Sequence, residues 1–350
     1  MPGFFSWIAG FFKAKEPTPP PAPEARLFNP AKTTSQDDAT KDPHVLTLQL
    51  EENLFCWLLD TGPANLRAQH AQSKPPGSAI EELQSRLANN KMEEVPRRPM
   101  TLPMLMKVLS DESADRQKLT QIILDDPALT DQILQVANSP YFRTGDHTIE
   151  SVDQAVFVLG ITGIRHVIAA AVMRPMMAAR NSREALFAQR AWLWGITCAR
   201  GTEFIAKLRN EDTSALFTTG LLPALSYISI RRELQRICRA QPGATEPDAA
   251  LIRHALARFQ WTVCQLIASE WNLPPKYHAY LMAAERPAPD QNQTTLADGM
   301  LIGSREVLRH AHQRNLPEED LDRIVRLTPE QTCRVRAALK AILSEGAARS

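Results

Sequence analysis

Histidines and acidic side chains are the residues of this chain that could bind a metal ion, and their spacing decides whether they do. His310 and His312 are two residues apart, a spacing that places them on different faces of a helix, so they are poor joint ligands. His166, His254 and His278 each stand alone in a helical pattern, where a histidine is far more often an ordinary side chain than a ligand. The sequence predicts no metal-binding or catalytic residue from these histidines.

The cysteines also give no sign of a catalytic or metal site. They are widely spaced, they include no CxxC pair, and their odd number argues against a disulfide framework. They are Cys56, Cys198, Cys238, Cys264 and Cys333. Reduced thiols in a cytoplasm fit this pattern best. The chain also lacks a nucleophile elbow, GxGxxG and a phosphate-binding GxxxxGKS/T loop, so no enzyme activity and no cofactor are predicted.

One basic run, from Arg231 to Arg239, is the local candidate for a nucleic-acid contact. Arg232, Arg236 and Arg239 would share one face of a helix, where phosphates could bind. Glu233 interrupts the run, however, and no aromatic residue is interleaved for base stacking. The whole chain has 40 basic and 39 acidic side chains, so no global field attracts nucleic acid or anionic lipid. Nucleic acid is therefore not predicted as a partner.

Helices must position these residues, and the stretch LTQIILDDPALTDQILQVANSPYF shows two of them clearly. Leu119 and Ile123 belong to an apolar stripe at helical spacing, which stops before Pro127 because a residue preceding proline avoids the α region. Asp126 can cap a second helix, and Pro127 suits its first position. That helix extends to about Ala137 and buries one face.

The rest of the chain repeats this helical pattern, so the predicted fold class is all-α. Capping boxes are predicted at Ser151 with Gln154 and at Thr245 with Asp248, and a similar start at Thr328 with Gln331. Gly160 is expected to end a turn of helix, and a helix is expected from Ala215 to Ile230. Residues 45–50 alternate like a strand, but a helix explains their continuation better.

The first 43 residues differ from the remainder. Residues 2–15 gather phenylalanines and a tryptophan on one helical face, which predicts either an anchor for a partner groove or membrane surface, or a helix packed on the protein's own core. Residues 16–43 are rich in proline and charge and are predicted to be a disordered tether. No apolar run approaches the roughly 20 residues of a membrane span, and no signal-peptide pattern opens the chain.

Three segments together resemble the bacterial HDOD signalling domain, a helical relative of the HD metal-dependent phosphohydrolases. They are TLP around Pro103, DDPALTDQILQVANSPYF, and SVDQAVFVLGITGIRHVIAA. The resemblance runs from about Arg97 to about Ala284. It implies a multi-helix HD/HDOD-like bundle with helical extensions at both ends. The expected organisation is a tether at 1–43, a helical extension at 44–96, an HDOD-like domain at 97–288 and a C-terminal helical segment at 289–350.

The same resemblance indicates where the metal ligands of an HD enzyme would lie, and this chain does not have them. The HD pair would follow Gly220-Leu221-Leu222, another histidine would follow Trp194, and a histidine pair would follow the later LP motif. The degenerate positions are instead occupied by Ile196 (after Gly195), Pro223, Ala224, Ala283 and Ala284. None of these side chains can coordinate a metal. Asp298 alone is a candidate remnant ligand.

The loop after the second helix is the candidate partner surface. Asn138, Ser139, Tyr141 and Arg143 are predicted to contact a partner, because aromatic residues and arginine are enriched at binding hot spots. The alternative is a structural loop in which Asn138 and Ser139 close the helix. Phe142 is predicted to be the buried aromatic of this loop.

The resemblance and the absent ligands together predict a non-catalytic HDOD protein-interaction module in bacterial signal transduction. Its expected partners are other signalling proteins in the cytoplasm. Two alternatives remain open: a degenerate HD site that binds a signalling nucleotide, and a residual metal-dependent phosphohydrolase.

Overall fold

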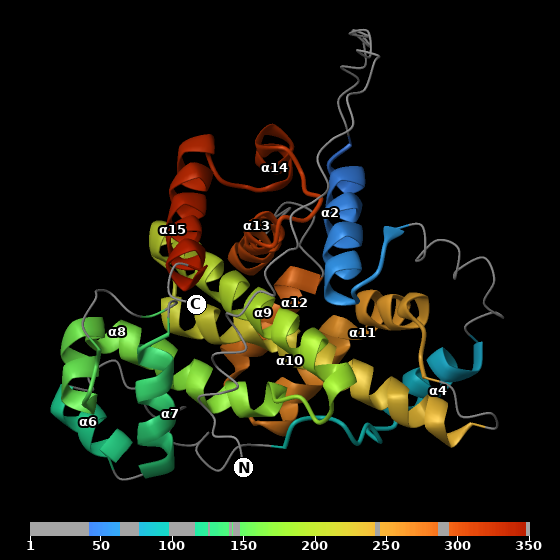
Figure 1. Ribbon diagram of the computed structural model, residues 1–350, viewed down its shortest axis with the longest axis horizontal. Helices are drawn as coiled ribbons and strands as arrows, with labels where there is room; N and C mark the ends of the chain where they lie inside the picture. The colour runs from blue at the N-terminus through green and yellow to red at the C-terminus, as the bar shows by residue number, and fades with distance from the viewer. Residues whose placement is uncertain are drawn as a thin grey trace, which may run out of the picture.

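Helices are the only regular elements in the described part of the chain, as the sequence predicts. The computed structural model describes residues 42–63, 77–97, 116–124, 127–139, 142, 148–241, 246–285 and 294–347. The predicted helix at residues 2–15 and nearly all of the predicted tether lie outside these ranges. The helices in Figure 1 are α2 (Pro43–Leu58), α4 (Gly77–Ala88), α6 (Arg116–Leu124), α7 (Pro127–Ala137), α8 (Val152–Met173), η1 (Arg174–Met177), α9 (Ser182–Arg209), α10 (Thr213–Ala240), α11 (Ala249–Glu270), α12 (Pro275–Glu285), α13 (Thr295–His310), α14 (Glu318–Ile324) and α15 (Pro329–Ala347).

The long helix α10 forms the centre of the molecule. Its side chains are buried along most of the length between Ser214 and Cys238. Helices α9 and α11 both pack along α10, and α13 packs in turn on α9. Helices α6, α7 and α8 form a second cluster that meets the centre where α8 contacts α10, at the lower left of Figure 1.

Small residues let α9 lie unusually close to both of its neighbours. A Cβ atom placed on Gly303 of α13 would lie 2.7 Å from the Cα of Cys198, and one on Gly220 of α10 would lie 2.8 Å from the Cα of Ala199. Both distances are shorter than carbon atoms pack, so only glycine fits at these two crossings. The order α13, α9, α10 is therefore fixed by close contact between backbones.

Local capping confirms two of the predicted helix starts. At α8 the Ser151 Oγ accepts a hydrogen bond of 3.1 Å from the Gln154 backbone N–H. At α15 the Thr328 Oγ accepts from the Gln331 N–H at 3.2 Å, while the Gln331 Oε1 accepts from the Thr328 N–H at 3.1 Å. Each box satisfies backbone donors that a helix start leaves without partners.

Two other predicted boundaries are wrong. The predicted box placed Asp248 inside the first turn of α11, but Asp248 is the N-cap and accepts a hydrogen bond of 2.7 Å from the Leu251 N–H; Thr245 lies outside the described residues. Asp248 has the short carboxylate that an N-cap prefers, so it serves by itself without the predicted box. The helix predicted to end at Ile230 continues to Ala240, because its apolar face continues through buried Leu234 and Ile237.

The boundaries around the opening stretch agree with the sequence. Helix α6 ends at Leu124 and α7 begins at Pro127, while the predicted cap Asp126 lies outside the described residues. Helix α8 is interrupted at Gly160, whose φ of 68° and ψ of 177° are not helical. Glycine adopts this positive φ without a steric penalty, which explains why the helical turn ends at Gly160, as predicted.

Two helical segments are long and apolar enough to cross a membrane by length and composition, contrary to the expectation from the sequence. They are 152–177, which joins α8 to η1, and α10. The apolar window of α10 is 94% buried inside the protein, and that of 152–177 is 61% buried. Core helices of water-soluble proteins have the same composition, so these two segments are weak evidence for a membrane span.

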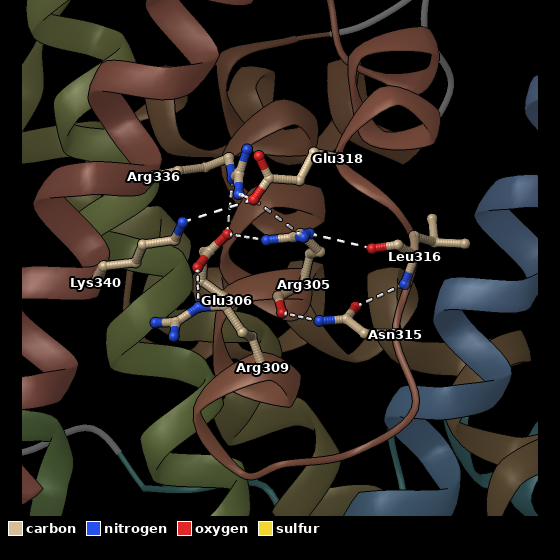
Figure 2. A network of polar contacts seen from close by, with 8 residues as sticks. All are labelled: Arg305, Glu306, Arg309, Asn315, Leu316, Glu318, Arg336 and Lys340. Carbon is tan, nitrogen blue, oxygen red and sulfur yellow. Dashed lines mark hydrogen bonds and ion pairs between the residues drawn. The ribbon is translucent and has the colours of Figure 1, made fainter.

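A buried network of charges ties the three C-terminal helices together (Figure 2). Glu306 of α13 is fully buried and accepts hydrogen bonds from Arg305 at 2.6 Å, Arg309 at 2.7 Å and Arg336 of α15 at 2.8 Å. Arg336 also pairs with Glu318 of α14. Burial alone would raise the pKa of Glu306, but the three guanidinium groups outweigh burial and lower that pKa below its ordinary value. The network holds α13, α14 and α15 in one arrangement.

Candidate functional site

The positions that would carry an HD pair lie where α9 contacts α10, and this contact is tightly packed. Gly195 of α9 faces Ala224 of α10, and a Cβ atom placed on Gly195 would lie 2.4 Å from the Cβ of Ala224. Ile196 and Pro223 are buried beside them. A histidine side chain has no room at position 195 while Ala224 lies opposite it.

Ala283 and Ala284, the third pair of degenerate positions, lie near the end of α12 and line a cavity of about 260 Å³. The cavity is partly open to solvent and is lined by side chains from α2, α9, α10, α11, α12 and α13. Trp194, Tyr227 and Trp261 supply its aromatic surface, and Gln260 and Glu51 are among its polar groups. Gly195, Ile196, Pro223 and Ala224 do not line it, so the degenerate positions are divided between a packed helix contact and a cavity.

Asp298, the candidate remnant ligand, is used to hold the fold together. Its buried carboxylate accepts a hydrogen bond of 2.8 Å from Arg209 of α9 and one of 3.0 Å from the backbone N–H of Arg326. Burial raises the pKa of Asp298, while the Arg326 N–H and the Arg209 guanidinium oppose that rise. Both carboxylate oxygens are therefore engaged by the chain itself.

Among the described histidines, His166 and His278 have different surroundings, whereas His310 lies near His312, so that burial, Arg309 and His312 together lower the pKa of His310. His166 is fully buried, stacks on Phe217 at 4.4 Å between ring centroids, and places its Nδ1 3.3 Å from Glu203 Oε1. The Nδ1 of His278 lies 2.7 Å from Gln265 Oε1. Within the described ranges, no three histidine, cysteine, aspartate or glutamate side chains approach closely enough to hold a metal ion. The described residues do not fit the divalent metal of an HD phosphohydrolase.

The arginines of the basic run are paired within the chain. Arg232 forms an ion pair with Glu184 and donates a hydrogen bond of 2.8 Å to the Ala178 carbonyl. Arg236 lies 2.6 Å from Glu93, and Arg239 lies 2.8 Å from a carboxylate oxygen of Glu246. These carboxylates already neutralise the face that phosphates would use.

Glu233, which interrupts the basic run, has a structural role that the sequence did not reveal. Its fully buried carboxylate accepts from Arg86 at 2.7 Å and from the backbone N–H groups of Glu93 and Glu94 at 3.0 and 2.9 Å. These bonds attach α4 and the segment after it to α10. A buried charge of this kind is stable only when several donors satisfy it.

The candidate partner loop begins with two side chains that form hydrogen bonds with backbone groups of nearby segments. Asn138 donates to the carbonyls of Leu134 at 2.8 Å and Ile149 at 2.7 Å, and its Oδ1 accepts 2.8 Å from the Ile149 N–H. Ser139 donates a hydrogen bond of 2.6 Å to the Val136 carbonyl. Asn138 therefore joins the end of α7 to the segment that leads into α8.

Phe142 is buried, as predicted for this loop, with 5% of its side chain exposed. Its ring packs edge-on against Phe217 at 6.1 Å, and the Arg200 guanidinium lies 5.5 Å from its centroid. Tyr141 and Arg143 lie outside the described residues. The partner contacts of Asn138, Ser139, Tyr141 and Arg143 stay a prediction.

The polar groups of the cavity were missed in the sequence, and no local signal could have found them. Glu51 lies on α2 and Gln260 on α11, so they are far apart in the chain. Neither belongs to a motif with a chemical meaning. Only the packing of α2 and α13 against α9 to α12 brings them to one cavity.

Comparisons with known proteins identify the family of this chain. A model of the HDOD domain matches residues 95–287, which is more than half of the chain. The uncharacterized protein YuxH of Bacillus subtilis (strain 168) is 23% identical over 193 residues, which cover 52% of this chain and 46% of that protein. The chain thus matches about half the length of this curated relative.

Solved structures share the fold at low sequence identity. An HDOD domain protein of unknown function from Geobacter sulfurreducens has a TM-score of 0.50 and 15% identity, over 75% of this chain and 94% of that chain. A protein inferred to be a metal-dependent phosphohydrolase, from Shewanella amazonensis SB2B, has a TM-score of 0.55 and 17% identity, over 77% of this chain and 99% of that chain.

A protein inferred to act in signal transduction, from Marinobacter aquaeolei VT8, has a TM-score of 0.51 and 15% identity, over 80% of this chain and 67% of that chain. At such identities the structural likeness shows the fold alone. The match to the domain model shows the family, and the chain therefore belongs to the HDOD domain family.

Proposed function

We propose that this chain is a non-catalytic regulatory module that acts by binding other proteins in bacterial signal transduction. The observation that carries the proposal is the contact between α9 and α10, where Pro223 and Ala224 occupy the place of the HD pair and Ala224 packs against Gly195. Phosphoryl chemistry of the HD type needs a metal to polarise the phosphoryl oxygen and to supply hydroxide. Without the metal ligands, the chain cannot carry out this reaction, but its helical surfaces can still bind other proteins.

Two further observations support a binding role over a residual hydrolase. Asp298, the candidate remnant ligand, is held by Arg209 and the Arg326 backbone, so coordinating a metal would break an existing buried pair. The structural relative from Marinobacter aquaeolei is inferred to act in signal transduction. A regulatory protein of this kind in the cytoplasm would contact its partners through exposed loops on a rigid helical scaffold.

A signalling nucleotide is a weaker proposal. The cavity beside Ala283 is the site where such a ligand could bind, but none of the described residues lining it is lysine or arginine. Phosphate groups are recognised by such cations or by helix N-termini. The cavity therefore offers phosphate no cationic side chain. The start of α13 borders it through Thr294 and Ala297, but the Ala297 N–H already donates to the Thr294 Oγ at 3.2 Å.

Affinity capture from a bacterial lysate, using the full-length chain as bait, tests the interaction role. Wild-type chain should retain a specific protein set, and Arg143→Ala should lose at least one member because arginine anchors contribute about 2 kcal/mol or more at hot spots. Arg334→Ala, an exposed arginine on α15, is the matched control and should retain the full set. Retention of no protein above the level of an unrelated helical bait would contradict the proposed function.

A further inference from the structure

The cavity beside α12 is built partly by helices outside the segment that matches the HDOD family. Helices α2 and α13 both contribute lining residues, and both lie outside residues 95–287. They also pack against each other and against α9. The cavity therefore forms at the junction between the HDOD core and the two extensions.

Aromatic side chains form the inner surface of this cavity. Trp194 and Tyr227 are almost fully buried and stack on each other, with ring centroids 4.7 Å apart and an angle of 23° between their planes. The Trp194 Nε1 donates a hydrogen bond of 2.9 Å to Ser304 Oγ, so the indole N–H is already satisfied. Trp261 of α11 adds a further aromatic surface. These surfaces favour an apolar or cationic group over an anion.

One polar atom at the cavity accepts no hydrogen bond from the protein. The Oε1 of Gln260 is buried and has no hydrogen-bond partner. A buried acceptor without a partner costs free energy, which a ligand carrying an N–H group would recover. Among the described residues that line the cavity, Glu51 alone carries a formal charge, and that charge is negative.

The surroundings of Glu51 also bear on whether the cavity favours a cation or an anion. Glu51 is exposed to solvent over part of its surface. The protein atoms packed around its carboxylate still raise its pKa, while Arg253 and His44 oppose the rise. A bound positive charge would stabilise the ionised carboxylate. Arg253 and His44 do not line the cavity, so they do not convert it into an anion site.

The size of the cavity limits the ligand. Its volume is about 260 Å³, below the ~300 Å³ at which pockets begin to hold drug-sized molecules, whereas benzene fits a cavity of about 150 Å³. One ring with a short side chain therefore fits, and a dinucleotide does not.

We propose that this cavity binds a small organic amine, whose positively charged N–H group meets Glu51 and Gln260 and whose apolar body lies on the aromatic side chains. Such a ligand would attach α2 to α11 and thereby join the N-terminal extension to the HDOD core. This site is separate from the loop assigned to partner proteins, so it extends the proposed function without depending on it.

Calorimetric titration of the full-length chain tests the site with two probes of one shape and opposite charge. The amine is 2-phenylethylamine, tested together with a panel of small aromatic and aliphatic amines, and the matched anion is 3-phenylpropanoate. Guanosine 5′-monophosphate tests the nucleotide alternative. At least one amine should bind with a Kd of about 1 mM or tighter, and the anion and the nucleotide should bind at least about tenfold more weakly.

Three variants, each checked for folding by circular dichroism, locate the site. Glu51→Gln and Gln260→Leu should each weaken amine binding by about tenfold. Glu52→Gln removes a charge from the neighbouring position of α2, outside the cavity lining, and should bind the amine as the wild type does. Absence of binding by every amine, equal affinity for the anion, or unchanged affinity in both cavity variants would overturn the proposal. Amine binding without capture of any protein would contradict only the interaction role.

Discussion

Single side chains in this protein join segments that are distant in the chain. Asn138 fixes the end of α7 to Ile149 with three hydrogen bonds, and Glu233 fixes α4 to α10. The sequence presented Asn138 as a candidate partner contact or a helix-closing residue, and Glu233 as a break in a basic run. Their roles depend on partners that no local spacing reveals.

Replacing Asn138 measures the structural role of the candidate partner loop. Asn138→Ala removes three hydrogen bonds at a half-buried position, so the free energy of unfolding should fall by about 2 to 3 kcal/mol. Asn89→Ala, which removes exposed bonds to Ser85, is the control and should cost less than about 1 kcal/mol. Urea denaturation measures both. A loss at Asn138 no larger than that at Asn89 would show that the loop does not need this side chain.

At the scale of elements, close packing and buried charge position the helices. Glycine at 220 and 303 brings α9 against α10 and α13, and the Glu306 network joins α13 to α14 and α15. Apolar periodicity predicted that these helices exist. Periodicity could not predict which helices contact each other. A glycine in the sequence can either end a helix or allow two helices to approach closely, and the sequence alone does not distinguish these roles.

The crossing of α9 and α13 can be tested by adding one methyl group. Gly303→Ala places a Cβ 2.7 Å from the Cα of Cys198, so the helices must move apart. Overpacking of this kind should reduce the free energy of unfolding by about 1 to 3 kcal/mol. Gly62→Ala meets no atom within 4 Å and should be close to neutral. Equal thermal midpoints for the two variants would show that α9 and α13 are not held this closely.

The charge network should make stability depend on acid pH. The folded-state pKa of Glu306 is lowered, so its contribution is fully present above the unfolded value of about 4.3 and is lost as pH falls through the lower folded value. Glu306→Gln leaves three arginines without their shared anion and should cost about 3 kcal/mol or more near neutral pH. The variant should also lose less stability than the wild type on acidification below that value.

Urea titrations at a series of pH values measure this dependence. Glu330→Gln, in the exposed first turn of α15, is the control and should retain the wild-type profile. A Glu306→Gln profile parallel to the wild type at all pH values would mean that this carboxylate is not stabilised by its arginines.

At the scale of the whole molecule, capping and periodicity predicted the fold class and most helices, because both patterns are local. The resemblance of three segments to the HDOD domain predicted the family. The absence of metal ligands could also be predicted, since proline and alanine cannot coordinate a metal. The cavity could not be predicted, because Glu51, Trp194 and Gln260 come from three helices distant in sequence. The start of α11 was misplaced because Thr245 and Asp248 both suit an N-cap by residue type.

Removal of the first 41 residues tests whether the described helices are stable without them. The deletion should stop there because Asp42 caps α2 through a 2.9 Å hydrogen bond from the His44 N–H. A polar, proline-rich segment contributes little buried area, so the thermal midpoint should change by less than about 5 °C. A longer deletion that also removes α2 takes away its buried side chains Leu46, Leu50 and Leu54 and exposes the apolar surface that they cover. This deletion should lower the thermal midpoint much further. A large fall from the shorter deletion would favour packing of residues 2–15 on the core.

Metal analysis combined with a hydrolysis assay is the most direct test of the proposal that this HDOD protein lacks phosphohydrolase activity. Purified full-length chain should contain no stoichiometric metal and should not hydrolyse nucleotides or cyclic dinucleotides with manganese, magnesium, iron or cobalt. Pro223→His with Ala224→Asp should remain inactive, because the other ligand positions stay empty. Metal content near about one equivalent per chain, together with turnover that chelation abolishes, would contradict the claim.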